Sequence, residues 1–218
     1  GALCHYNHMN GTPAPLEMDN LYLVDSGGQY LDGTTDITRT VVVGEPSEEH
    51  RRMFTLVLKG HIALARAVFP RGTTGTQLDI LARQFLWSDG LDYDHGTGHG
   101  VGTFLSVHEG PQRIGKAGPQ QELLPGMVIS NEPGYYKEGC YGIRCENLVV
   151  VIERSDGMLA FETITFAPFD YKLIDLNLMN ADEVAWVNNY HAKVNEKLCG
   201  ELDGQDVSWL KQATKAIA

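Results

Sequence analysis

The chain has 218 residues, with 17 Lys or Arg against 28 Asp or Glu, so its formal net charge is −11 with His neutral. This charge disfavours a nucleic-acid partner, because binding to a polyanion requires a basic face that neutralises phosphates. The longest apolar runs fall far short of the roughly 20 residues that a transmembrane helix needs, so we expect no membrane span.

Hydrophobic residues make up 43% of the chain and charged residues 21%, which is typical of a globular domain with a sizeable core. The chain has four cysteines without a CxxC pair, and no secretory signal is visible at its N-terminus. We therefore expect reduced thiols and a cytoplasmic location.

Two β-strands are predicted first, over residues 21–25 and 35–43. Glycine-bearing turns are expected between them at residues 26–28 and 32–33. The strands should therefore form a hairpin.

Two helices are predicted next. The first covers residues 47–69, where Ser47 precedes an amphipathic stretch with acidic residues in its first turn. The second covers residues 76–90, where Thr76 and Asp79 resemble a capping box.

The remainder of the chain alternates strand signals with turns and ends in a helix. A helix over residues 181–198 is indicated by Asn180 and Glu183 at its start. The hairpin turns and the small number of helices favour an α+β fold with a mixed, mostly antiparallel sheet covered by helices. The remaining strands are predicted over 127–130, 142–153 and 158–166.

Asp25 and Asp36 lie eleven residues apart, on strands that the hairpin would place side by side. A carboxylate at the end of a buried strand is unfavourable unless it is paired or binds a cation. Alternatively, Asp25 makes an Asx-type turn bond and Asp36 pairs with Arg39.

Three histidines, His95, His99 and His108, fall within fourteen residues. The glycines in residues 95–102 disfavour a helix, so the segment is interpreted as a glycine-rich strand or loop close to a metal or substrate. Each histidine alone fits an ordinary core or surface position, whereas the group favours a site.

Two further acids, Glu132 and Glu146, lie near the ends of predicted strands. Glu146 interrupts an apolar strand. Glu146 either contributes to a functional site or forms a buried pair with Arg144, since residues two apart lie on the same face of a strand.

Five candidate ligands follow from these three groups. Four carboxylates carry −4, which two divalent cations would neutralise. Oxygen-rich coordination with one imidazole suits Mn²⁺, and Mg²⁺, Co²⁺, Fe²⁺ and Zn²⁺ are compatible. Two such ions can share and activate a water for hydrolysis. The candidate ligands are Asp25, Asp36, His99, Glu132 and Glu146.

The motifs around these residues resemble the catalytic domain of the Xaa-Pro aminopeptidases (aminopeptidase P), over nearly all of the chain. This resemblance implies a pita-bread fold of two pseudo-symmetric halves and removal of an N-terminal residue that precedes proline. It also implies two Mn²⁺ ions, with Asp36 and Glu146 bridging both. The motifs are DSGGQY (25–30), DGTTDITRT (32–40), HGTGHGVG (95–102), VHEGP (107–111), NEPGYY (131–136) and GIRCEN (142–147).

The resemblance also implies roles for residues around the metals. His5, His95 and His108 match substrate-binding and proton-handling histidines, with His95 and His108 also counted as catalytic. Glu132 would act as the general base that works with a bridging hydroxide, and Arg144 would orient the ligands and substrate.

Residues 1–170 are expected to form the catalytic domain, without its first helix, and residues 171–218 its C-terminal helical extension. Upstream domains are expected to be missing from this chain. Trp186, Tyr190 and Trp209 suggest a homodimer contact, and packing on the same chain is the alternative.

The resemblance leaves two other functions open. A prolidase would share the proline requirement but act on Xaa-Pro dipeptides. A pita-bread binding module would be non-catalytic, although all five ligand types are present here. Methionine aminopeptidases differ around the last glutamate.

Overall fold

The computed structural model describes residue 9, residues 15–118 and residues 120–218. In chain order its strands are β1 (Asn20–Tyr30), β2 (Gly33–Val43), β3 (Val68–Phe69), β4 (Gly98–His99), β5 (Arg113–Ile114), β6 (Val128–Asn131), β7 (Gly134–Lys137), β8 (Tyr141–Arg144), β9 (Asn147–Glu153) and β10 (Leu159–Thr163). The α-helices are α1 (Glu48–Ala65), α2 (Gly75–Ser88), α3 (Ala181–Leu198) and α4 (Gly204–Ala213), and 3₁₀ helices cover Tyr171–Leu173 and Leu176–Leu178.

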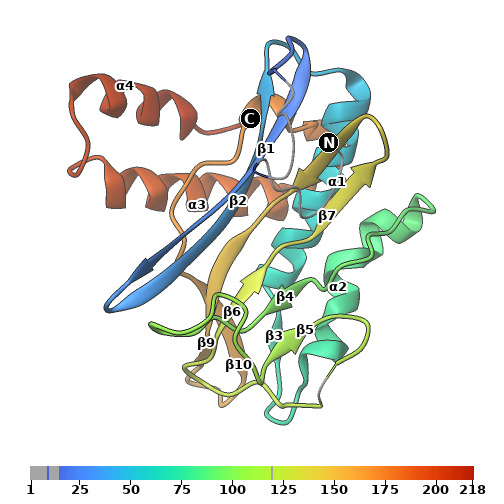
Figure 1. Cartoon of the computed structure of the whole chain (residues 1–218), viewed down its shortest axis with the longest axis vertical. Helices are drawn as coiled ribbons and strands as arrows, with labels where there is room; N and C mark the ends of the chain where they lie inside the picture. Colours follow the sequence, from blue (N-terminus) through green and yellow to red (C-terminus); the bar gives the residue numbers. More distant parts are fainter. Residues whose placement is uncertain (1–8, 10–14, 119) are drawn as a thin grey trace.

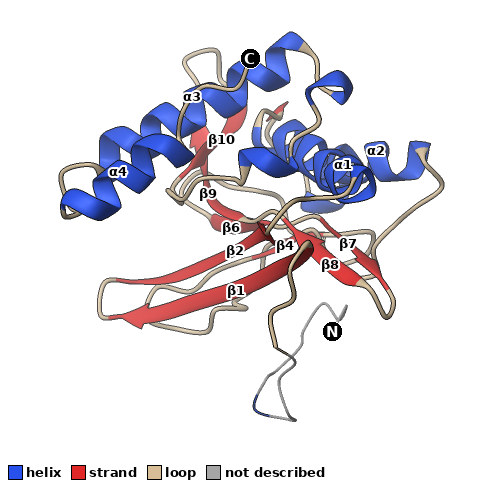
Figure 2. Cartoon of the chain, turned by 90° about the horizontal axis from the view of Figure 1, so that it is seen from above, coloured by secondary structure: helices blue, strands red, loops and turns tan. Residues whose placement is uncertain are grey.

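The strands form antiparallel sheets that lie on one side of the helices (Figures 1 and 2). A four-stranded sheet has the order β3-β10-β9-β6, and the pairs β1-β2, β4-β5 and β7-β8 complete the strand layer. This arrangement confirms the predicted α+β class with mostly antiparallel strands. Within the described residues, no helix is both long and apolar enough to span a membrane.

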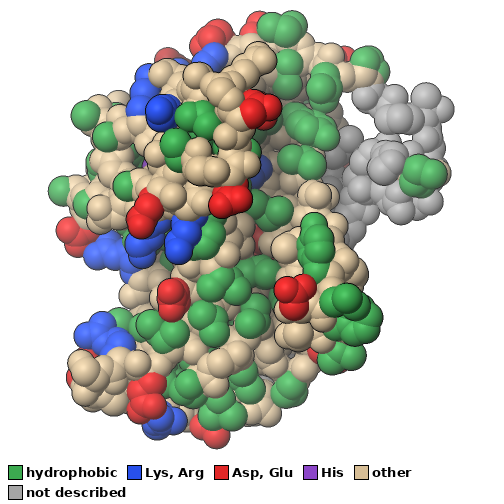
Figure 3. All heavy atoms as spheres, turned by 90° about the vertical axis from the view of Figure 1, so that its left-hand side faces the viewer, with side chains coloured by type: hydrophobic (Ala, Val, Ile, Leu, Met, Phe, Trp, Pro, Cys, Tyr) green, Lys and Arg blue, Asp and Glu red, His purple; other side chains and the backbone are tan. Residues whose placement is uncertain are grey.

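Helix α1 is central to the core. Its Phe54 and Val57 belong to a buried cluster that extends to β8 and α3, whereas Leu64 belongs to a second cluster against the four-stranded sheet. Burial of each such side chain stabilises the fold by about 1.5–3 kcal/mol. On the face shown in Figure 3, acidic and basic side chains are interspersed.

The β1-β2 hairpin is longer than the sequence predicts. Strand β1 continues to Tyr30, so the predicted turn at residues 26–28 is wrong and the connection lies at residues 31–32. Gly27 pairs with Asp36, and a Cβ on Gly27 would lie 2.8 Å from the Thr35 carbonyl oxygen. Glycine is needed there for a close backbone approach within the strand.

The helix boundaries differ from prediction at two points. α1 begins after Ser47 as predicted, but it ends at Ala65 because Val68–Phe69 pairs with β10. α2 is capped by Thr74, whose backbone N–H donates to Gln77 Oε1 at 2.8 Å. The capping box predicted at Thr76 is therefore wrong.

Helix α3 has the predicted bounds, and its predicted start residues, Asn180 and Glu183, form a capping box. Glu183 N donates to Asn180 Oδ1 at 2.9 Å, and Asn180 N donates to Glu183 Oε2 at 2.8 Å. Trp186 stacks on Tyr190 with ring centroids 5.3 Å apart, which supports the alternative that these rings pack on their own chain. Trp209 is 59% exposed, and the homodimer stays a prediction.

The strand predicted over residues 142–153 is broken in two. β8 ends at Arg144 and pairs with β7, whereas β9 begins at Asn147 and pairs with β6 and β10. Glu146 N instead donates to Thr38 O, on β2, at 3.2 Å. The alternative considered for Glu146, a buried pair with Arg144 on the same face of one strand, is therefore wrong.

Candidate metal centre

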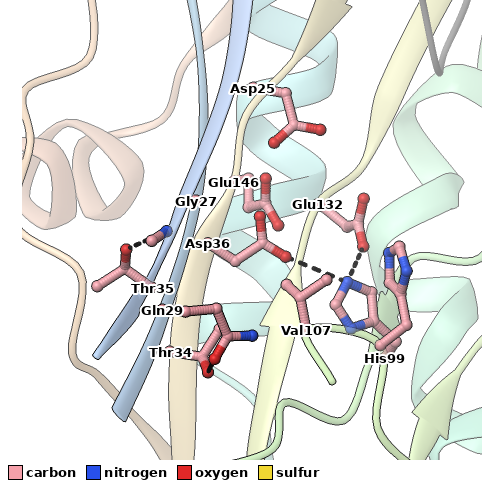
Figure 4. A pocket seen from close by; sticks show the side chains of 12 residues that line it. Asp25, Gly27, Gln29, Thr34, Thr35, Asp36, His99, Val107, Glu132 and Glu146 are labelled. Atoms are coloured by element: carbon pink, nitrogen blue, oxygen red, sulfur yellow. Dashed lines mark hydrogen bonds and ion pairs between the residues drawn. The ribbon is translucent and has the colours of Figure 1, made fainter. Parts of the chain in front are cut away.

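A pocket of about 300 Å³ opens beside the β1-β2 hairpin. Figure 4 shows that four carboxylates and an imidazole point toward one another in it. The lining residues are Asp25, Gly27, Gly28, Gln29, Thr34, Thr35, Asp36, His99, Val107, His108, Glu132 and Glu146. All five candidate metal ligands are among them.

The hairpin register places Asp25 and Asp36 on one face. Asp25 pairs with Thr38, and Gly27 pairs with Asp36. Side chains directly opposite or two residues apart share a face, so Asp25, Asp36 and Thr38 lie together. Asp25 lies within β1, so neither the strand end nor the turn bond considered for it is observed.

The other three candidates come from segments far apart in the sequence. His99 lies in β4, Glu132 follows β6, and Glu146 lies in the break between β8 and β9. His99 Nε2 is 3.4 Å from Asp36 Oδ2 and 3.2 Å from Glu132 Oε1. Potential ligand atoms of Asp36, His99 and Glu146 all lie within 4.8 Å of one another.

The His99 ring is oriented by hydrogen bonds. Its Nδ1 is 2.9 Å from Gly100 O, and its backbone N–H donates to Ser130 Oγ at 3.0 Å. Donation from Nδ1 to a carbonyl leaves Nε2 free to face the carboxylates, as in metal-ligating histidines. Ser130 Oγ in turn donates to Glu132 Oε1 at 2.9 Å.

The electrostatics of the pocket are those of a site that needs a cation. Burial, followed by the charges of Glu132 and Asp36, raises the pKa of Glu146 well above its ordinary value. Burial also raises the pKa of Asp25, against the effect of Arg144. Crowded carboxylates of this kind with one imidazole fit hard divalent cations, which remove the repulsion.

His99 supplies positive charge when no metal is bound. Burial would lower the pKa of His99, but hydrogen bonds to Asp36 and Glu132 raise it to about 10. Burial likewise opposes ionisation of Glu132, yet the hydrogen bond and charge of His99 lower the pKa of Glu132. An imidazolium between two carboxylates therefore occupies the place where a cation is favoured.

Arg144 donates hydrogen bonds to residues that form the wall of the pocket. Its Nη2 donates to Asp25 Oδ2 at 2.6 Å, and its Nε donates to Thr38 Oγ1 at 2.9 Å. Thr38 Oγ1 donates onward to Glu146 Oε2 at 2.5 Å. The guanidinium thus binds Asp25 directly, lies 3.9 Å from Glu132 Oε2 through its Nε, and is linked to Glu146 through Thr38.

The three remaining predicted histidines lie in different places. His108 lines the pocket, and its ring meets the His99 ring edge to face at 4.2 Å. His95 lies outside the pocket lining, and its Nε2 is 2.9 Å from Tyr136 OH, which accepts from Arg144 Nη1. Burial lowers the pKa of His95. His5 lies outside the described residues.

Three contributing residues were not singled out from the sequence: Thr38, Ser130 and Tyr136. Thr38 follows Asp36 by two residues, so strand alternation could have placed it on the pocket face. Tyr136 lies within the motif NEPGYY and Ser130 lies directly before it, but their contacts reach His95 and His99, more than thirty positions away. No local pattern indicates those partners.

Comparison with known proteins gives two family matches. The sequence model of metallopeptidase family M24 matches residues 1–153, and the model described as the C-terminal region of peptidase M24 matches residues 157–217. Aminopeptidase P1 of Lotus japonicus is 51% identical, over all of this chain and 34% of that protein. The probable Xaa-Pro aminopeptidase P of Tuber melanosporum is 53% identical, over 99% of this chain and 37% of that protein.

Solved structures agree with these matches. The X-prolyl aminopeptidase of Caenorhabditis elegans, described as a cytosolic enzyme with a di-nuclear active site, has a TM-score of 0.86 and 44% identity, and the match covers 90% of this chain and 34% of that one. Prolidase from Pyrococcus furiosus has a TM-score of 0.62 and 34% identity, covering 70% and 43%. These neighbours confirm the pita-bread fold. The chain spans about a third of the length of the curated relatives described above.

Proposed function

Because this chain belongs to metallopeptidase family M24, we propose that it hydrolyses the bond between an N-terminal residue and a following proline. The observation that carries the proposal is the convergence of four carboxylates and His99 in one pocket. Relatives that are 52% and 53% identical and are named probable Xaa-Pro aminopeptidase P support the choice of substrate. We also propose a cytoplasmic location, which rests on the cytosolic C. elegans relative.

We propose that the pocket holds two divalent cations, with Mn²⁺ as the first choice. Asp36 and Glu146 would hold both ions together with His99, because ligand atoms of these three residues lie within 4.8 Å of one another. In Figure 4, Asp25 lies above these two carboxylates and Glu132 lies beside them. When bound, the two ions supply an activated water and polarise the scissile carbonyl.

Glu132 is the proposed general base. Its Oε1 accepts from Ser130 and faces His99, which fixes the carboxylate in the pocket. The lowered pKa keeps Glu132 ionised, so it can accept a proton.

The histidines are proposed to hold the substrate. An Xaa-Pro bond is a tertiary amide without an N–H, so it must be held through its carbonyl oxygen and its ring. His108 lines the pocket and can donate to that oxygen. His95 reaches the site through Tyr136, and Arg144 keeps Asp25 and Thr38 in place. His5 is proposed as a third substrate contact.

The test is hydrolysis of Arg-Pro-Pro, Ala-Pro and Met-Ala-Ser after metal removal, with and without added Mn²⁺. We expect Mn²⁺-dependent cleavage of Arg-Pro-Pro, with little activity on the other two. Cleavage of Ala-Pro alone would assign a prolidase. Metal binding without hydrolysis of any peptide would indicate a non-catalytic binding module.

A further inference from the structure

Arg39 is a buried cation that the proposed chemistry does not use. It lies three residues after Asp36 on β2, so strand alternation directs it away from the pocket face. Its side chain is surrounded by oxygen atoms. Its donors reach Thr38 O at 2.9 Å, Asn147 Oδ1 at 2.7 Å, Ala167 O at 2.8 Å, Tyr190 OH at 2.9 Å, Pro168 O at 3.2 Å and Glu146 O.

The acceptors around Arg39 are neutral. Among the residues that the structure describes, no ion pair includes Arg39, and the ring of Phe169 lies 4.2 Å from its guanidinium carbon. Burial of a charge is unfavourable unless hydrogen bonds compensate for it. The planar guanidinium presents several donors in a fixed fork, so it can hold several carbonyls in a fixed relation.

These acceptors belong to two separate parts of the chain. Glu146 and Asn147 adjoin the pocket, whereas Ala167, Pro168 and Tyr190 lie in the segment matched by the C-terminal M24 region. Tyr190 OH also donates to Ala167 O at 2.8 Å. The guanidinium therefore joins helix α3 to the wall of the candidate metal centre.

Glu146 depends on β2 for its position. It lies between β8 and β9, outside both strands. Its backbone N–H donates to Thr38 O, its carbonyl accepts from Arg39, and its Oε2 accepts from Thr38 Oγ1. The separation of Glu146 from Asp36 is thus set by contacts to the strand that carries Asp36.

We propose that Arg39 is a positioning residue through which helix α3 fixes Glu146 at the metal centre. The inference rests on the proposed function, because it assumes that Glu146 binds metal. If Arg39 has this role, the metal affinity of the pocket depends on Tyr190, whose hydroxyl belongs to α3 and contacts none of the five candidate ligands.

The test compares three variants of the chain by calorimetric titration of the metal-free protein with Mn²⁺. Arg39→Lys keeps the charge but loses the fork, and loss of such an outer contact weakens metal binding roughly 10- to 100-fold. Tyr190→Phe keeps the ring stacking and loses only the hydroxyl, so a smaller decrease in Mn²⁺ affinity is expected.

Asn188→Ala is the matched control. Asn188 also lies on α3, and its side chain exchanges two hydrogen bonds with the backbone of Ile217, away from Arg39. We expect this variant to lower the melting temperature without changing the Mn²⁺ affinity. If Mn²⁺ affinity fell equally in Asn188→Ala, affinity would simply follow stability and the proposal would be overturned.

The remaining outcomes separate the two proposals. Unchanged Mn²⁺ affinity in Tyr190→Phe, with two ions bound by the wild type, overturns the role of Arg39 and leaves the metal centre intact. This variant decides the matter alone if Arg39→Lys does not fold. A wild type that binds no Mn²⁺ overturns the metal centre itself.

Discussion

Two histidines of this chain are largely removed from bulk water, yet one is neutral and the other is positively charged. His61, on α1, is fully buried, and burial lowers its pKa to about 3. Its Nδ1 lies 3.1 Å from Asn131 O and 3.2 Å from Cys145 O, which are neutral groups. His99, in the pocket, also loses water, yet hydrogen bonds to two carboxylates raise its pKa to about 10.

The carboxylates show the same contrast between core and pocket. Elsewhere a buried acid has its own cation, as in Glu183 with Lys59 at 2.6 Å and Asp79 with Arg83 at 2.7 Å. In the pocket, Asp25, Asp36 and Glu132 share Arg144 and His99, and among the described residues no ion pair includes Glu146. The core is balanced by the chain itself, whereas the pocket has an excess of negative charge that an external cation must balance.

The largest expected effect comes from removing that negative charge. Glu146→Gln should abolish retention of Mn²⁺ and peptide hydrolysis. Burial and neighbouring carboxylates raise the pKa of Glu146, so its ionised form destabilises the metal-free fold increasingly as pH rises above 4.5. The variant should therefore melt at a higher temperature than the metal-free wild type at pH 7.

Elemental analysis and thermal melts of both proteins check this expectation. Asp36→Asn is the companion variant, and it should lose the metal in the same way. If Glu146→Gln retained two ions, the negative charge of Glu146 would not be needed for metal binding. The claim that the pocket, unlike the core, depends on an external cation would then be contradicted.

A large effect on rate is expected from Glu132→Gln. The amide can still accept a hydrogen bond from Ser130, but it cannot accept a proton from water. Turnover of Arg-Pro-Pro should fall by a factor of about 10² or more, while part of the bound Mn²⁺ is retained. Steady-state kinetics beside metal analysis separate the two effects, and full activity would exclude Glu132 as the base.

The core side of the comparison is tested by His61→Phe. Loss of the imidazole leaves buried carbonyls without its N–H, which should lower the free energy of unfolding at pH 7 by about 1–3 kcal/mol. The pKa of His61 is lowered from 6.5 to about 3, so the wild type loses stability as pH falls through that window. The His61→Phe variant should lose less stability than the wild type over the same fall in pH.

Urea unfolding at pH 7 and pH 5 measures both quantities. An equal loss of stability between the two pH values in wild type and variant would show that His61 is not held neutral in the fold.

Much of the pocket follows from local sequence, because β-hairpins and glycine-rich segments have short-range signals. Asp25 and Asp36 come together through one hairpin, and strand alternation fixes their common face. The extension of β1 through Gly27 was missed because glycine in that position also signals a turn.

The long-range contacts could not be predicted. Arg39 donates a hydrogen bond to Tyr190 OH, 151 residues further along the chain. Glu146 lies outside the strands on either side of it because its backbone N–H donates to Thr38 O on β2. Tyr136 OH lies 2.9 Å from His95 Nε2, a contact that the sequence spacing does not indicate. Such partners are selected by tertiary packing, for which sequence spacing gives no signal.

The smallest expected effect is proton release on metal binding. The pKa of His99 is about 10 without metal, so the ring holds a proton at pH 7.5, and Nε2 must lose it to bind a cation. The affinity for Mn²⁺ should therefore rise with pH. Titration calorimetry in two buffers of different ionisation enthalpy should show release of about one proton or more, whereas buffer-independent heats would contradict this assignment.

The central claim is that the excess charge of the pocket binds two cations. Crystals of the Mn²⁺-loaded chain, measured near the manganese absorption edge, test it directly. We predict two anomalous peaks roughly 3.5–4 Å apart between Asp36 and Glu146. A pocket without anomalous density, or with a single peak at saturating Mn²⁺, would contradict the dinuclear centre.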